Sequence, residues 1–198
     1  MTKEYRILTD CDGVLLSWEA AFEEWLNDKG YFKTPDHDVT AYKLHIHYGL
    51  PTKVIQNLVA EFNESAAIGY LSPFRDAAEI VPLMRREGTR FAVLTSLSTN
   101  KWSERARNHN LNRVFGENVF DFVECLEVGA DKDEALEKHK LSYDVWVEDK
   151  WENAVVGHKL GYKTFLMSHN HNGHRSEFPE IIRVDNWYEI YQYLENQE

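Results

Sequence analysis

The 198-residue chain contains few cysteines, no long apolar run and a deficit of positive charge. Its two cysteines, Cys11 and Cys125, are too few for a disulfide framework, which favours a reducing compartment. No apolar stretch approaches the roughly 18–20 residues that cross a membrane. Residues 1–5 also lack the charged-then-apolar pattern of a signal peptide. The sequence therefore predicts a cytoplasmic protein that has no membrane partner.

Acidic residues outnumber basic residues by 33 to 22, which gives a formal net charge of −11. This charge disfavours broad contact with a nucleic acid polymer or an anionic membrane surface. A small anionic substrate remains compatible with it, because a metal ion and one or two lysines suffice to hold one locally. The hydrophobic content of 43% is that of an ordinary globular protein, and the length suffices for one well-buried core.

Hydrophobic periodicity predicts an alternation of short strands and helices. Apolar runs predict strands at residues 5–9, 91–94, 119–123, 145–147, 163–167 and 181–184. Helical patterns lie between or after them, at residues 101–110, 133–140, 153–160 and 187–194. Strands that alternate with helices predict an α/β fold with a parallel sheet covered on both faces.

Residues 17–72 interrupt this alternation, since they contain helical patterns but no clear strand. Apolar residues recur at helical spacing over 18–26 and 52–62. A further helix is expected over 74–86, opened by Pro73. We expect residues 17–72 to form a small helical cap over the carboxyl edge of the sheet, with 1–16 and 73–198 as the core.

The most informative motif is Asp10-Cys11-Asp12-Gly13, which stands where the first apolar run ends. On an extended backbone, residues two apart point the same way, so Asp10 and Asp12 are expected to share one face. Two carboxylates at this range repel unless a cation lies between them or one keeps a proton. The pair predicts an Mg²⁺ and phosphate site, although acids and glycine are also common in solvated turns.

Other polar residues follow or precede predicted elements at the same edge of the sheet. Thr95 and Ser96 follow the second strand, Lys132 precedes a helix, and Glu148 and Asp149 follow the fourth strand. Each has an ordinary alternative as a helix cap, a solvated lysine or a turn. Together with the aspartate pair they supply a nucleophile, an acid/base, a phosphate clamp and metal ligands. Phosphoryl transfer through an aspartyl-phosphate requires these parts.

In their order and position, these motifs resemble those of the haloacid dehalogenase superfamily of phosphohydrolases, over residues 5–167. The resemblance implies a Rossmann-like three-layer core with a parallel sheet, a cap inserted after the first strand, and Mg²⁺ as the cofactor. It implies that Asp10 attacks phosphorus, while Asp12 protonates the leaving oxygen and later activates water. It also implies roles for Thr95 and Lys132 in catalysis. The implied metal ligands are Asp10, Asp12, Glu148 and Asp149.

Within the superfamily, the chain is most similar to the 5′(3′)-deoxyribonucleotidase group of cytosolic and mitochondrial type. The similarity rests on Asp-Cys-Asp-Gly-Val-Leu at 10–15 with Trp18 after it, on Thr95-Ser96, and on the run from Val147 to Asn153. It implies a nucleoside monophosphate substrate, with Trp18 stacking on the base and Ser96 in the substrate site. Trp18 also belongs to an apolar helical stripe, a pattern typical of a core residue.

Several alternatives remain open from the sequence. The substrate could be another small phosphate ester, such as a sugar phosphate. A receiver-like phosphoacceptor module is disfavoured, because no acid follows an apolar strand between Asp12 and Thr95. A catalytically silent binding scaffold is disfavoured by the four intact motifs.

Histidines form two further groups. His169, His171 and His174 have a tolerable spacing for zinc, but no obvious acid or thiol partner, which favours a polar and substrate-facing loop. His45 and His47 alternate within the expected cap, so that one of them could reach the site.

Overall fold

The computed structural model describes residues 4–196 and contains a six-stranded parallel sheet in the order β3-β2-β1-β4-β5-β6. The predicted strands are all present, and β3 continues three residues beyond its expected end. The strands are β1 (Arg6–Thr9), β2 (Arg90–Ser96), β3 (Phe120–Leu126), β4 (Val145–Glu148), β5 (Lys163–Met167) and β6 (Ile182–Val184).

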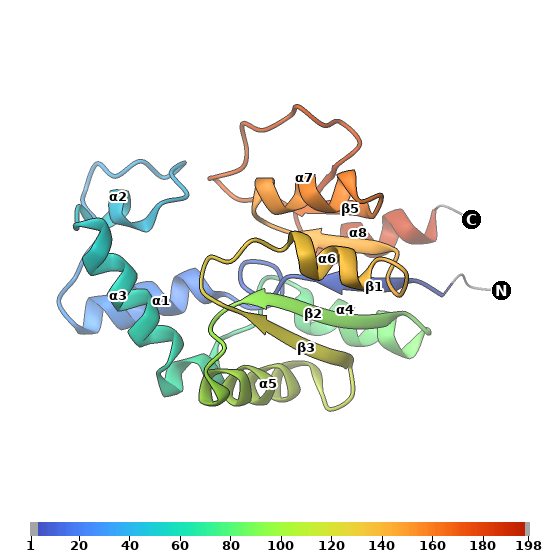
Figure 1. Cartoon of the computed structure of the whole chain (residues 1–198), viewed down its shortest axis with the longest axis horizontal. Helices are drawn as coiled ribbons and strands as arrows, with labels where there is room; N and C mark the ends of the chain where they lie inside the picture. The colour runs from blue at the N-terminus through green and yellow to red at the C-terminus, as the bar shows by residue number, and fades with distance from the viewer. Residues whose placement is uncertain (1–3, 197–198) are drawn as a thin grey trace.

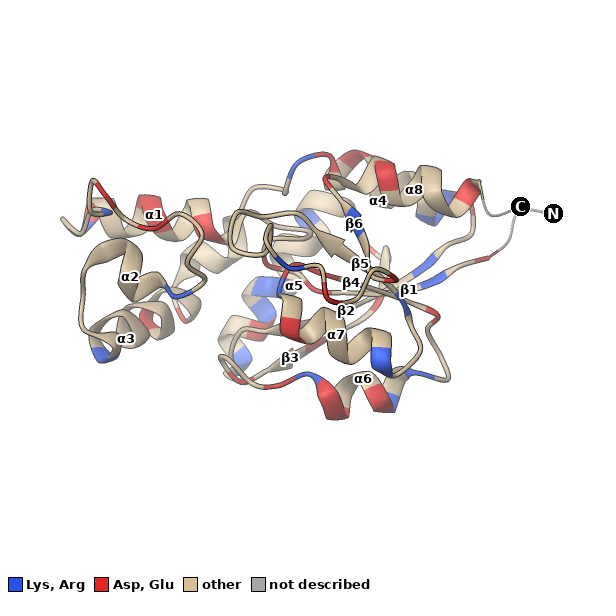
Figure 2. Ribbon diagram, turned by 90° about the horizontal axis from the view of Figure 1, so that it is seen from above, with Lys and Arg blue, Asp and Glu red and all other residues tan. Residues whose placement is uncertain are grey.

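Helices cover both faces of the sheet, which makes a three-layer α/β structure. Figure 2 shows α4 and α8 on one side of the strands and α6 and α7 on the other. Neighbouring strand residues alternate between the layers: Ile7 of β1 belongs to the core cluster that contains residues of α4, α5 and α8, whereas Leu8 belongs to the one that contains residues of α6. These helices are α4 (Ala77–Arg86), α5 (Lys101–Phe115), α6 (Asp133–His139), α7 (Trp151–Lys159) and α8 (Trp187–Glu195).

The segment between β1 and α4 lies beyond the carboxyl ends of the strands, on the side of the molecule away from the termini (Figure 1). We call residues 17–72 the cap segment; its status as a separate subdomain stays a prediction. Aromatic rings hold its helices together, since Phe22 lies 4.7 Å from Trp18 and 5.3 Å from Phe62 between ring centroids. The segment contains α1 (Trp18–Asp28), α2 (Leu44–Tyr48), α3 (Thr52–Asn63) and the 3₁₀ helix η1 (Ala66–Tyr70).

The helix predicted from residue 74 begins only at Ala77, so that boundary is wrong. Pro73 forms an antiparallel bridge with Leu16, and the N–H of Phe74 donates to the carbonyl of Leu15 at 2.8 Å. Arg75 then takes a positive φ of 47°. The returning chain pairs with the outgoing chain here, and a helix cannot form until this pairing ends.

Membrane-spanning character is absent from residues 4–196: none of the helices there combines the length and apolar composition that a bilayer requires.

Candidate active site

A cavity of about 520 Å³ lies between the carboxyl ends of the strands and the cap segment. His47 of the cap segment is one of the residues that line the cavity. Its side chain is buried, and its Nε2 lies 2.7 Å from the carbonyl oxygen of Ala41. Every residue that the sequence predicts for the site lines this cavity: Asp10, Asp12, Trp18, Thr95, Ser96, Lys132, Glu148 and Asp149.

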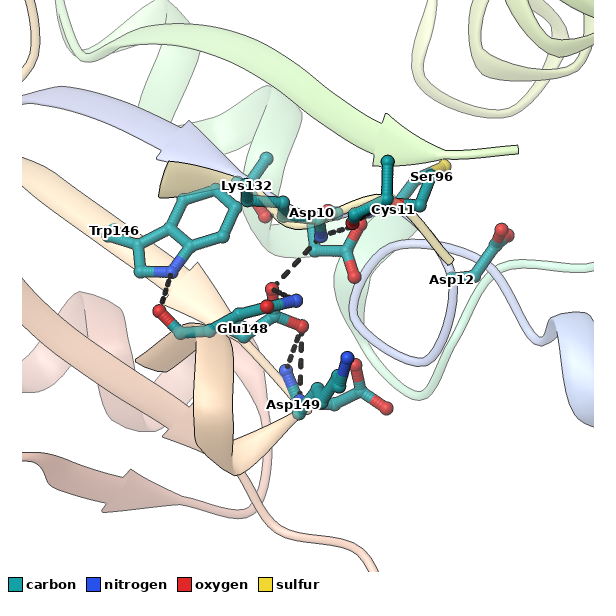
Figure 3. A network of polar contacts seen from close by, with 12 residues as sticks. Asp10, Cys11, Asp12, Ser96, Lys132, Trp146, Glu148 and Asp149 are labelled. Carbon is teal, nitrogen blue, oxygen red and sulfur yellow. Dashed lines mark hydrogen bonds and ion pairs between the residues drawn. The ribbon is translucent and has the colours of Figure 1, made fainter. Parts of the chain in front are cut away.

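Asp10 and Lys132 come from separate elements and meet at the edge of the sheet (Figure 3). Asp10 follows β1, where its N–H donates to the carbonyl of Val147 at 2.8 Å, and Lys132 immediately precedes α6. Nζ of Lys132 lies 2.8 Å from Oδ1 of Asp10. Burial, reinforced by the charge of Glu148, raises the pKa of Asp10 well above its usual value, and Lys132 opposes this rise. A buried ammonium group therefore contacts the predicted nucleophile.

Glu148 is fully buried and organises its neighbours through both carboxylate oxygens. Oε1 accepts the backbone N–H groups of Asp149 and Lys150, each at 3.0 Å. Oε2 accepts from Nζ of Lys132 at 2.9 Å and from Nδ2 of Asn153 at 3.1 Å. Burial raises the pKa of Glu148, but the charge of Lys132 and the hydrogen bonds from Asp149 and Lys150 outweigh burial and bring this pKa down to about 2. Glu148 is thus an ionised acceptor whose lone pairs are already engaged.

Asp10, Glu148 and Asp149 form an acidic cluster in which one oxygen of each lies within 4.8 Å of the others. Burial and the charges of Glu148 and Asp10 raise the pKa of Asp149 well above its usual value. A cation among these carboxylates would relieve their repulsion. Because the oxygens of Glu148 are hydrogen-bonded, Asp10 and Asp149 are the carboxylates best placed to bind it. A donor set made only of oxygen atoms fits Mg²⁺.

Asp12 has a partner that the sequence does not predict. Nη2 of the fully buried Arg107 lies 2.7 Å from Oδ1 and 2.9 Å from Oδ2 of Asp12, and its Nη1 lies 3.2 Å from Sγ of Cys11. Burial raises the pKa of Asp12, and Arg107 opposes this effect. Figure 3 shows Asp12 pointing away from Asp10. The expected shared orientation is not observed, because β1 ends before Asp10 and the chain then turns.

Thr95 presents a buried hydroxyl group at the cavity. Its side chain is fully buried, and Oγ1 has no hydrogen-bond partner within residues 4–196. An unsatisfied buried hydroxyl costs about 1–3 kcal/mol, so a ligand oxygen at this point would be favourable. The hydroxyl of Ser96 instead donates to the carbonyl of Ala130 at 3.3 Å. Ser96 thereby ties the end of β2 to the loop that carries Lys132.

Trp18 lies at the start of α1 and is anchored through the end of α3. Its Nε1 donates to Oδ1 of Asn63 at 2.9 Å, and Nδ2 of Asn63 donates to the carbonyl of Leu97 at 3.0 Å. The indole therefore both packs on Phe22, as the core interpretation predicts, and lines the cavity, as the substrate interpretation predicts.

The loop over residues 168–174 brings two histidines to the cavity. Nε2 of His169 lies 2.8 Å from the carbonyl oxygen of Gly13, and Nε2 of His171 lies 3.2 Å from that of Asp149. The two imidazole rings stack with their centroids 5.2 Å apart. Burial lowers the pKa of His169 to about 4 and also lowers that of His171. Both rings are therefore neutral near pH 7, and both have Asp149 close by.

Two curated proteins are similar in sequence to this chain. A nucleotidase of Clostridium acetobutylicum is 24% identical over an alignment 201 positions long, which covers 96% of this chain and 93% of that protein. An uncharacterized 32.4 kDa protein of enterobacteria phage T4 is 27% identical over 146 residues, which cover 70% of this chain. The match spans only about half (51%) of the phage protein's length. No protein-family model matches the chain.

Solved structures match over nearly the whole chain. CbbY from Rhodobacter sphaeroides, in complex with phosphate, superimposes with a TM-score of 0.61 at 19% identity, covering 95% of this chain and 96% of its own. A 2-haloacid dehalogenase from Pseudomonas syringae gives 0.55 at 16% identity, covering 99% of this chain and 100% of its own. These matches establish the fold: the chain has the Rossmann-like α/β fold of haloacid dehalogenase-like proteins, as its motifs predict.

Proposed function

We propose that this protein is a Mg²⁺-dependent phosphomonoesterase that works through an aspartyl-phosphate on Asp10. The observation that carries the proposal is the convergence in one cavity of the Asp10–Lys132 pair, the Asp149 carboxylate and the Thr95 hydroxyl, which has no hydrogen-bond partner among the described residues. An ammonium and a hydroxyl group are the donors that phosphate oxygens need as charge shifts during transfer. The nucleotidase among the sequence relatives, and a structural neighbour that binds phosphate, support the same class.

In the proposed reaction, a carboxylate oxygen of Asp10 attacks phosphorus, and the bond from phosphorus to the leaving oxygen breaks. Lys132 and Thr95 donate hydrogen bonds to the phosphoryl oxygens. Asp12 gives a proton to the leaving oxygen, then takes one from the water that attacks the aspartyl-phosphate, which releases inorganic phosphate. Because Asp12 contacts Arg107 in this structure, its carboxyl group must turn from Arg107 to reach the leaving oxygen.

Asp10, Asp149 and the main-chain carbonyl of Asp12 would hold Mg²⁺, which supplies positive charge beside the phosphate when bound. Glu148 is a predicted ligand, but its four hydrogen bonds favour a supporting role in this proposal. It would hold Lys132 against Asp10 and fix the backbone at Asp149.

We favour a nucleoside monophosphate as the substrate. A volume of about 520 Å³ lies within the roughly 300–1,000 Å³ typical of ligand sites. The residues that line the cavity include three aromatic ones, Trp18, Tyr42 and Phe74. A nucleobase has flat apolar faces that aromatic side chains can bury, whereas a sugar carries hydroxyl groups around its ring.

A sugar phosphate is the second candidate, because a CbbY variant similar over 94% of this chain was crystallised with xylulose-1,5-bisphosphate. Charged and polar groups on the cap side, including Glu19, Glu23 and His47, would then contact the sugar hydroxyls.

Asp10→Asn tests the proposed nucleophile. Phosphate release from deoxynucleoside monophosphates with Mg²⁺ is expected to fall by at least about 10³-fold, because an amide cannot form the acyl-phosphate. Asp131→Asn, which changes an exposed acid near the same edge, is the control and should retain activity. Turnover that survives Asp10→Asn would overturn the mechanism. Faster turnover of sugar phosphates than of nucleotides by the unmodified protein would overturn only the nucleotidase assignment.

A further inference from the structure

A second set of potential metal ligands adjoins the acidic cluster and consists of His169, His171 and Asp149. One ligand atom of each lies within 4.8 Å of the others. Nε2 of His171 is 3.7 Å from Oδ2 of Asp149. That same oxygen and Nε2 of His169 both face Gly13: a Cβ on this glycine would lie 2.7 Å and 3.3 Å from them, respectively. The missing side chain of Gly13 thus leaves space where the three groups converge.

Aromatic packing fixes the orientation of both imidazole rings. His169 is stacked between Phe74 and His171, at centroid distances of 5.0 Å and 5.2 Å, and Tyr42 meets His171 edge-on at 5.1 Å. Because both faces of His169 are covered, its ring can offer a ligand only its edge, where the nitrogen atoms lie. Rings held in this way lose little conformational freedom on binding.

We propose that His169, His171 and Asp149 form a second divalent-metal site, suited to an ion such as Zn²⁺ that accepts nitrogen ligands. Two imidazoles and a carboxylate, completed by water, are a donor set found at zinc sites, whereas Mg²⁺ prefers oxygen ligands. Each neutral ring would carry its proton on Nδ1 and exchange the contact of Nε2 with a carbonyl for a bond to the metal. The acid partner that the sequence does not reveal is Asp149, which becomes adjacent because β4 and β5 are neighbours in the sheet.

Asp149 would belong to both sites, so the two metals would not bind independently. Zn²⁺ at the histidine site would engage a carboxylate proposed for Mg²⁺, and the apparent affinity for each ion should fall as the other is added. The histidine site itself does not depend on the proposed phosphatase activity.

The test uses the full chain, with Zn²⁺ and Co²⁺ as the probes. Calorimetry should show about one equivalent of Zn²⁺ bound, and Co²⁺ should give a visible absorption band of a site with nitrogen ligands. Loss of a group that merely supports a ligand costs roughly tenfold to a hundredfold in metal affinity. His169→Gln and His171→Gln are therefore each expected to weaken Zn²⁺ binding by at least about tenfold. His174→Gln, which changes an exposed histidine of the same loop, is the matched control.

Unchanged Zn²⁺ affinity in the His169→Gln/His171→Gln double variant, or no binding by the unmodified chain, would overturn the proposal. Near-UV circular dichroism checks that each variant is folded, and His171→Gln alone suffices if His169→Gln does not fold. Since these measurements do not use turnover, their failure is distinct from failure of the proposed function. Mg²⁺-dependent phosphate release by the histidine variants would support that function even if the zinc site were absent.

Discussion

Arg107 places a completely buried guanidinium group against Asp12, and this ion pair makes a strong energetic prediction. Removing one member of a fully buried pair costs about 3–5 kcal/mol, and the lower end, about 3 kcal/mol, is expected here because the Asp12 side chain is 22% exposed. Arg107→Leu is expected to lower the free energy of unfolding by about this amount in urea denaturation. Arg105→Leu, which changes an exposed arginine of the same helix, should change it by less than about 0.5 kcal/mol.

A double-mutant cycle, which also measures Asp12→Asn alone, separates the ion pair from the packing of the arginine side chain. Arg107→Leu combined with Asp12→Asn removes both charges and should be more stable than Arg107→Leu alone. If the double variant is no more stable than the single variant, the charge on Asp12 does not depend on Arg107 for its stabilisation.

The sequence does not identify Arg107, because the buried stripe of α5 is largely polar. Ser103, Arg107 and Asn110 continue at helical spacing into Leu111 and Phe115, and all five are buried. Polar residues at these positions are typical of a solvated helix face. The buried face of α5 can be recognised only by starting from Leu111 and Phe115 and following the helical spacing back toward the start of the helix. In contrast, Asp10 and Lys132 are predictable, since parallel strands bring their carboxyl ends to one edge.

Among the elements, α1 and α3 are joined to the end of β2 through Asn63, which accepts from Trp18 and donates to Leu97. Asn63→Leu leaves the buried carbonyl of Leu97 unpaired, with a cost of about 1–3 kcal/mol, and also removes the acceptor of the part-buried Trp18 N–H. Because Asn63 holds the indole of Trp18, Asn63→Leu should raise the KM for nucleotides roughly five- to tenfold if Trp18 stacks on a nucleobase. The KM for a small phosphate ester without a base should change little.

Trp18→Phe is the variant to compare with Asn63→Leu. It keeps an aromatic ring at position 18 but removes the indole N–H that donates to Asn63. Steady-state kinetics on both substrates would check the expectation. An equal rise in KM for the nucleotide and the small ester would contradict a role for Trp18 in base recognition.

Elements that local interactions determine are predictable from the sequence, whereas features that depend on contacts between distant residues are not. Strands such as β5 show in local apolar runs, and the structure confirms its bounds. The start of α4 is set by pairing of Pro73 with Leu16, which no local pattern contains. The contact of His171 with Asp149 likewise depends on the order of strands in the sheet, so the sequence leaves that loop without an acid partner.

On the scale of the whole molecule, the charges of Asp10 and Asp149 in the acidic cluster oppose folding near neutral pH when no cation is bound. Burial and neighbouring carboxylates raise the pKa values of Asp10 and Asp149 in the folded state. A carboxyl group whose folded-state pKa is raised stabilises the fold while protonated, and this contribution is lost as pH rises through the raised pKa. Glu148 has a lowered pKa, so its ionised form stabilises the fold. This contribution to stability is lost only as pH falls toward about 2.

Asp149→Asn should therefore stabilise the metal-free protein, since it removes one buried charge and keeps the shape of the side chain. The gain should appear near pH 7, because burial and the charges of Glu148 and Asp10 disfavour the ionised form of Asp149 in the folded protein. For a chain of this length, each kcal/mol gained corresponds to a rise of about 2–4 °C in Tm. The gain should shrink on acidification toward about pH 4, where the unmodified Asp149 is also protonated.

Binding of Mg²⁺ should also stabilise the protein, because an ion that binds only the folded state stabilises that state by mass action. Adding Mg²⁺ should raise the Tm of the unmodified protein, and chelation should reverse the rise. Asp149→Asn should reduce this response, whereas Asp131→Asn, at an exposed acid, should keep it. A metal-free Asp149→Asn variant that melts below the unmodified protein would show that this carboxylate supports the fold. The cluster would then be a structural network. Removing a charge from a site that is maintained for cation binding is instead expected to make the metal-free protein more stable.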